Sequence, residues 1–184
     1  MENPLKGFIL RKIAQLDKKE DSYSKAACAK LRRAVGKIPG ECPDVWDITL
    51  RDAPEGRVNA DVIHTILTLY ALHSQGKDES MNDDQTGFGT AIAKLIDDKN
   101  ENAIRRRFNA VSTSAEFTEL AYHARGLVHL LKAKGIKMDY ARFAGDLKSF
   151  QNPEYTNNIR LKWGKEFYRT NTSEEIKTER TDES

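Results

Sequence analysis

The sequence lacks a long apolar run. None of its apolar stretches approaches the roughly 20 residues that a membrane-spanning helix needs, and the first residues, Met1 to Lys6, show no cleavable signal pattern. Hydrophobic residues make up 39% of the chain and charged residues 32%, a balance that is too apolar for a disordered protein and too polar for a membrane protein. We therefore expect a globular, cytoplasmic protein without a membrane partner.

Cysteine is also scarce. Only Cys28 and Cys42 are present, and without a secretory signal we expect both to stay reduced and to act as small packing residues. Neither cysteine belongs to a C-x-x-C motif. The chain has four histidines, none at the close spacing of a zinc motif: His64, His73, His123 and His129. The sequence therefore predicts no metal site and no cofactor.

Enzymatic motifs are missing as well. Gly87 and Gly89 precede a helical pattern, but Ile92 stands where a dinucleotide-binding motif has its third glycine, so the two glycines indicate a tight turn. The acidic segment 78–84 lacks the turn glycine and the closing glutamate of a calcium-binding loop. The paired carboxylates at 97–101 have no second acidic motif to act with. We predict that the chain is not an enzyme.

The alternation of apolar and polar residues that marks a half-buried strand is absent, whereas helical spacing recurs along the chain. We predict an all-α fold, a compact multi-helix bundle of about eight or nine helices. Asn59 is expected to cap the central, buried helix. The type of the short apolar piece at 45–50 stays open. The expected helices cover residues 4–16, 24–35, 60–74, 90–97, 102–111, 114–134, 140–150 and 154–169.

The polar, acidic segment 76–87 separates the two halves of this pattern. We expect a mobile surface loop there, which is the boundary if the chain forms two small helical lobes. The helical domain is expected to span residues 1–170. Residues 171–184 contain a single large apolar residue, Ile176, so we expect a polar, acidic and poorly ordered tail.

Positive charge is in small excess only. The formal net charge is +2; residues 170–184 hold five acids and two bases, which leaves 28 bases against 23 acids, a net of +5, for residues 1–169. So small an excess does not by itself predict nucleic-acid binding. The argument depends on whether the bases cluster on helix faces.

The first basic cluster lies on the helix at 24–35 and the turn after it. Its bases occupy the arc opposite the apolar residues, and the segment 25–40 holds five bases and no acid to pair with them. The alternative is an ordinary solvated face, but such a face usually carries acids too. We predict nucleic-acid contacts from Lys30, Arg32, Arg33 and Lys37.

The second cluster consists of the consecutive Arg105, Arg106 and Arg107. We expect Arg105 and Arg106 on the exposed arc of their helix and Arg107 near its boundary, within reach of Glu101 or Asp98. Arginine suits phosphate because its planar fork donates two parallel hydrogen bonds. Nucleic-acid contacts and structural ion pairs both stay open for this trio on the residues alone.

Two further patches are less specific. Arg125 shares a face of the helix at 114–134 with Tyr122, His129 and Lys132, and such a mixture of aromatic and cationic side chains suits bases and phosphates. A partly buried rim is the alternative. The last patch follows one arc of the final helix and comprises Lys162, Lys165 and Arg169.

With these segments in place, the chain resembles the CasB family, the small subunit of the type I-E CRISPR Cascade surveillance complex. The resemblance extends from the first helix to about Arg169. It rests on the order and spacing of five short segments, none of which is diagnostic alone: CAKLRRAVGK, PGECPDVW, TGFGTAIAKL, ENAIRRRFNAV and NIRLKWGKEFYR.

The resemblance implies a non-catalytic function. CasB proteins are small helical proteins, present as a pair, that lie beside guide RNA and target DNA and steady the R-loop and its displaced strand through backbone contacts. The partners implied are the other Cascade subunits, the guide RNA, the target DNA and a second copy of the chain. The basic surface of the family maps onto Lys30, Arg32, Arg33, Arg105 and Arg106, and more loosely onto Arg125 and Lys162.

Two other classes of protein are alternatives to this one. A free-standing helical DNA-binding regulator needs a second helix with base-reading side chains, and the sequence shows arginines but no clear recognition helix. A hydrolase or nuclease acting with the same complex needs metal ligands that the sequence does not supply. The acidic tail is not explained by the resemblance.

Overall fold

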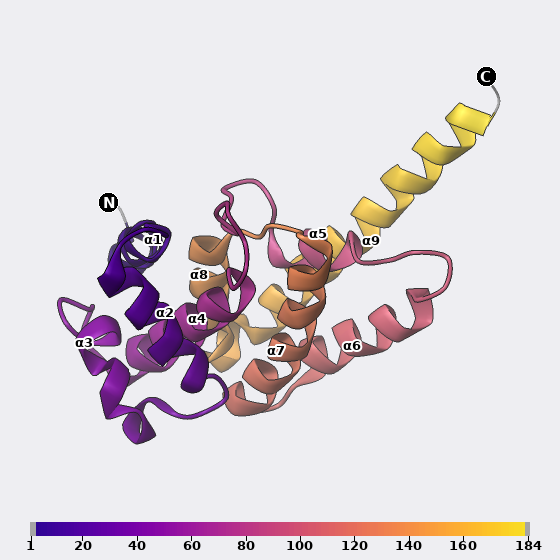
Figure 1. Cartoon of the computed structure of the whole chain (residues 1–184). Helices are drawn as coiled ribbons and strands as arrows, with labels where there is room; N and C mark the ends of the chain where they lie inside the picture. Colours follow the sequence, from indigo (N-terminus) through magenta and orange to yellow (C-terminus); the bar gives the residue numbers. More distant parts are fainter. Residues whose placement is uncertain (1–2, 183–184) are drawn as a thin grey trace.

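The computed structural model describes residues 3–182, with side chains up to Thr170. The described chain forms nine α-helices and two short 3-10 helices and no strand, which confirms the predicted all-α fold (Figure 1). The elements are α1 (Pro4–Leu16), α2 (Ser22–Arg33), η1 (Pro39–Glu41), η2 (Pro43–Val45), α3 (Trp46–Thr49), α4 (Arg57–His73), α5 (Phe88–Ala93), α6 (Glu101–Thr113), α7 (Phe117–Lys134), α8 (Tyr140–Phe150) and α9 (Pro153–Asp182).

The first two helices begin at local capping signals. The Asn3 side chain accepts a hydrogen bond from the backbone N–H of Leu5 at 3.1 Å. Asp21 caps α2 in the same way, accepting from the backbone N–H of Ser24 at 2.8 Å. The chain turns away after α2 at Gly36, whose φ of 81° suits glycine. The two caps fix where α1 and α2 begin, and Gly36 lets the chain turn after the basic end of α2.

Helix α4 is the central helix, and it packs against α1, α2, α7 and α8. It begins at Arg57, directly after Gly56, whose φ of 103° only glycine adopts readily. The predicted cap at Asn59 is therefore wrong. Asn59 lies inside the first turn, and its side-chain Nδ2 donates to the carbonyl of Glu55 at 2.6 Å.

The described residues form one hydrophobic core rather than two lobes. Helix α8, from the second half of the chain, packs on α1 and α4 from the first half. The segment 76–87 joins this core, because Met81 is 1% exposed and its carbonyl accepts from the backbone N–H of Met138 at 3.1 Å. The backbone N–H of Asp139 also donates to the carbonyl of Thr86 at 2.8 Å. This segment is held against the start of α8 and does not separate two bodies.

The tightest helix contact joins α5 and α9. Phe88 stacks on Phe143 with ring centroids 4.5 Å apart and lies 5.0 Å from the ring of Trp163. Trp163 is fully buried, and its indole N–H donates to Asp146 Oδ2 at 2.9 Å. A methyl group on Gly89 would lie 2.3 Å from the carbonyl oxygen of Trp163, so the two helix backbones touch there. Gly87 is the N-cap of α5 and Gly89 lies in its first turn, so the two glycines open a helix and do not form a separate turn.

Helix α9 is longer than predicted. The sequence predicts its end near Arg169, where the apolar stripe stops, but the helix continues to Asp182 and extends away from the other helices (Figure 1). No proline or glycine follows Gly164 to end it. The poor order predicted for residues 171–184 stays a prediction.

Both cysteines are free and buried, as predicted. Cys28 lies in α2, where its Sγ approaches the carbonyl of Leu16 at 3.9 Å, and Cys42 lies between the two 3-10 helices. Burial raises the pKa of both thiols. They are packing residues with little thiolate character.

Candidate nucleic-acid interface

The end of α2 presents the first predicted basic cluster to solvent. Arg33 and Lys37 are exposed, and Lys30 and Arg32 are half-buried. Among the residues that the structure describes, none of these four forms an ion pair. Lys25, at the other end of the cluster, lies 3.9 Å from Glu20. The charge at the end of α2 is therefore available to an external anion.

Arg32 lies on the wall of a shallow hollow between α2 and the residues that follow α4. Lys19, Lys25 and Lys77 line the same hollow. Lys77 has no ion pair in the described chain, whereas Lys19 lies 3.7 Å from Asp17. The sequence analysis missed Lys77 because it lies in the segment after α4, with no helical periodicity to place it beside α2. Four cations around one hollow make a site suited to a phosphate.

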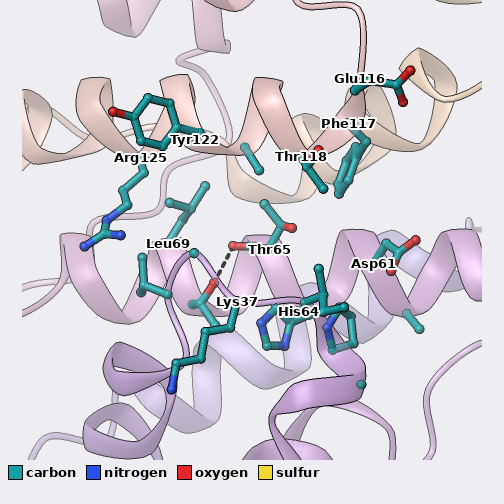
Figure 2. Close-up of a pocket in the computed structure, with 18 of the residues that line it drawn as sticks. Lys37, Asp61, His64, Thr65, Leu69, Glu116, Phe117, Thr118, Tyr122 and Arg125 are labelled. Atoms are coloured by element: carbon teal, nitrogen blue, oxygen red, sulfur yellow. Dashed lines mark hydrogen bonds between the residues drawn. The ribbon is translucent and has the colours of Figure 1, made fainter.

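Arg125 joins the end of α2 to α7. A methyl group on Gly36 would lie 2.9 Å from Arg125 Nη1, so the guanidinium rests directly on the turn after α2. Arg125 is exposed and has no ion pair in the part of the chain that is described. In Figure 2 Arg125 and Lys37 lie at the same end of a cavity between α7 and α4. The first and third predicted patches therefore form one surface.

The rest of the α7 patch adds to this positive surface. Lys132 Nζ donates to Gln75 Oε1 at 2.8 Å, which places it beside the hollow that Arg32 lines. Burial, and then the positive charges of Arg125 and Lys132, lower the pKa of His129. His129 is therefore neutral at pH 7, and the charge of the patch comes from its arginine and lysine.

The arginine trio on α6 is divided between two roles. Arg105 makes two contacts with Glu101, at 2.6 and 2.9 Å, and its guanidinium lies 5.3 Å from the ring centroid of Tyr168. Arg105 is thus half-buried rather than on the exposed arc, and of the two roles left open for it the structure shows the ion pair, because Glu101 lies four residues before it on the same helix face. Arg106 and Arg107 are exposed and have no ion pair among the described residues.

Lys162 on α9 is also a structural residue. Its Nζ contacts Asp146, the buried carboxylate that accepts the indole N–H of Trp163. Helix α8 thus supplies it with a partner that is remote in the sequence, and its nucleic-acid contact stays a prediction. Lys165 is exposed, without an ion pair in the described chain, and lines a shallow groove with Arg142. Arg142 itself is paired with Glu166.

Replacing Lys162 by methionine is expected to lower the free energy of unfolding by about 1–2 kcal/mol, because the carboxylate of Asp146 loses its charged partner while staying largely buried. Urea denaturation measures the change, and nucleic-acid affinity should stay as it was. Lys165→Met removes the same charge from the same helix and should leave stability unaltered. Equal stability of the two variants would show that the ion pair contributes nothing.

The described residues contain no group of three or more His, Cys, Asp or Glu placed to hold a metal ion. None of the helices within the described range is both long and apolar enough to cross a membrane.

The fold and this surface define a class of protein. It is a small all-α protein whose unpaired cations group at the end of α2, on α6 and on α7, an arrangement suited to the phosphates of a nucleic acid. The family model of CRISPR-associated protein Cse2 (CRISPR_cse2) matches residues 27–168. The chain therefore belongs to the Cse2 family, and the resemblance to CasB is confirmed.

Solved structures of CasB proteins have the same fold. CasB from Thermobifida fusca is 26% identical, with a TM-score of 0.79, over 91% of this chain and 99% of that one. CasB from M. ruber is 24% identical, with a TM-score of 0.74, over 95% and 98%. A chain of a CRISPR RNA-guided surveillance complex is 16% identical, with a TM-score of 0.80, over 95% and 99%. No curated protein sequence is similar enough to count as a match.

Proposed function

We propose that the chain is the small, non-catalytic subunit of a type I-E CRISPR Cascade complex. The observation that carries the proposal is family membership over residues 27–168 combined with a fold that covers 99% of a chain of an RNA-guided surveillance complex. Its partners are then the other Cascade subunits, the guide RNA, the target DNA and a second copy of itself. It works in the cytoplasm, where these components meet.

Its task is to hold the R-loop through the nucleic-acid backbone. Guide RNA pairing supplies sequence specificity in such complexes, so the protein needs only contacts common to all sequences. Arg32, Arg33, Lys37 and Arg125 are suited to this, because they have no acidic partner in the described chain and lie at the end of α2 and against the turn after it. Exposed Arg106 and Arg107 add a second point of contact on α6. The displaced DNA strand is the proposed occupant of these surfaces.

The test is the double variant Arg32→Ala/Arg33→Ala. Arg33 is exposed and Arg32 half-buried, so the core should stay intact and the melting temperature should hardly change. Binding to DNA and RNA of unrelated sequences should weaken. The slope of log affinity against log salt should fall by up to about two contacts, at roughly 0.7 to 0.9 per contact. Fluorescence anisotropy titrations at several salt concentrations measure both quantities.

Lys94→Ala/Lys99→Ala is the matched control, because it removes the same charge from exposed positions outside the proposed surface. In the assembled complex, the arginine variant should destabilise the R-loop more than it affects guide RNA retention. An unchanged salt slope in a folded arginine variant would mean that the basic surface is assigned to the wrong helix. Equal losses of affinity in both variants would mean that total charge, and not the position of the arginines, determines binding.

A further inference from the structure

A cavity of about 690 Å³ lies between α7, the first half of α4 and the segment 36–40. Its size falls within the range of about 300 to 1,000 Å³ that is usual for small-molecule sites. Figure 2 shows Phe117 reaching into it from α7, with His64 between α4 and the segment 36–40 on the opposite side. The cavity is thus a defined space that the basic surface borders at Lys37 and Arg125.

The mouth of the cavity carries cations and an exposed aromatic ring. Lys37 and Arg125 line it without an ion pair in the described chain, and Arg57 lies 3.9 Å from Asp61, which also lines the cavity. Tyr122, at the outer edge on α7, is 72% exposed. A phosphate at Lys37 and Arg125 would leave the group attached to it within reach of the cavity.

We infer that this cavity receives an unpaired nucleobase of a single strand whose phosphates lie on Lys37 and Arg125. The inference rests on the proposed function and deepens it. A base has a flat apolar face for Phe117 and Tyr122 and an edge that both donates and accepts hydrogen bonds. Asp61 and Glu116, which also line the cavity, suit bases with amino groups.

A segment of a partner protein is the competing occupant. Ile38 and Val58 at the mouth are 51% and 40% exposed and would suit an apolar side chain. Such a side chain would have no use for the unpaired Lys37 and Arg125. Charge therefore favours the nucleobase.

The test compares two strands of equal charge, twelve thymidine nucleotides and twelve abasic deoxyribose phosphates. Fluorescence anisotropy measures their affinity for the full chain at one salt concentration. The thymidine strand should bind roughly 5- to 150-fold more tightly, the effect expected for stacking and bonding one base. Ala121→Trp, which fills the cavity from α7, should bring the two affinities together and leave the salt slope unchanged.

Ala133→Trp is the matched control, because Ala133 is exposed on the same helix and does not line the cavity. It should keep the full preference for thymidine. Tyr122→Ala, which removes the exposed aromatic ring at the edge of the cavity, should lower the preference several-fold, and it serves as the second variant if Ala121→Trp does not fold. Circular dichroism melts show whether each variant is folded.

Equal binding of both strands by the unaltered chain would overturn the inference and leave backbone binding intact. Binding of neither strand would overturn the proposed function as well. If folded Ala121→Trp keeps the preference for thymidine, the base binds at another place on the protein. If Ala121→Trp no longer assembles with purified Cascade subunits, and every variant binds the two strands equally, the cavity binds a protein partner instead.

Discussion

Replacing Gly89 by alanine is expected to lower the free energy of unfolding by about 3 kcal/mol, or to prevent folding. The added methyl group would lie 2.3 Å from the carbonyl oxygen of Trp163 and 3.1 Å from the backbone nitrogen of Phe167. Both are backbone atoms of a packed helix, so relief requires α5 and α9 to separate. The gain from alanine in a helix, about 0.5–1 kcal/mol, is too small to offset this cost.

Gly164→Ala is the control, because Gly164 follows Trp163 on α9 but does not face α5. A methyl group there would meet nothing within 4 Å, so this variant should gain about 0.5–1 kcal/mol from helix propensity alone. Urea denaturation of both variants measures the difference. If Gly89→Ala proves as stable as the unaltered protein, the close approach of α5 and α9 is not present in solution.

Acidification from pH 7 to pH 4.5 is expected to remove about 2 kcal/mol of stability through His73. Burial lowers the pKa of His73 from 6.5 to about 4, aided by the positive charges of Lys77 and Lys132 and opposed by the backbone carbonyl of Ile136. The unfolded chain therefore takes up the proton first as the pH falls. The stability is complete above pH 6.5 and is lost as the pH approaches 4. His64 adds in the same direction, because its pKa is also lowered.

The measurement is the free energy of unfolding from urea titrations between pH 7 and pH 4.5. Carboxylates such as Asp83 and Asp97, whose pKa values are lowered, begin to contribute only at the lower end of this window, below about pH 5. His73→Asn should be less stable at pH 7, because His73 Nδ1 lies 2.9 Å from the hydroxyl of Tyr140. Its stability should depend less on pH. An unaltered pH dependence in His73→Asn would assign the acid sensitivity to other groups.

Most of the helices could be predicted from local spacing. The apolar residues of α1, α4 and α8 recur at helical intervals, and a proline after Asn3 marks the start of α1. Local chemistry also explains why Arg32 and Arg33 stay unpaired, since no acid lies within four residues of either one. Arg105 could have been placed by the same rule, because Glu101 lies one turn before it.

Tertiary packing decided the rest. Asp146 of α8 neutralises Lys162 of α9, and Lys77 joins Arg32, through contacts that no helical interval encodes. The cavity likewise exists only because α7 lies beside α4 and Arg125 rests on Gly36. The amino-acid sequence by itself determined the helical class, the family and the basic faces, because spacing and composition along one helix are local properties. Only the tertiary structure decided which basic residues lack an ion pair and where a cavity opens. Both depend on which side chains from distant segments meet.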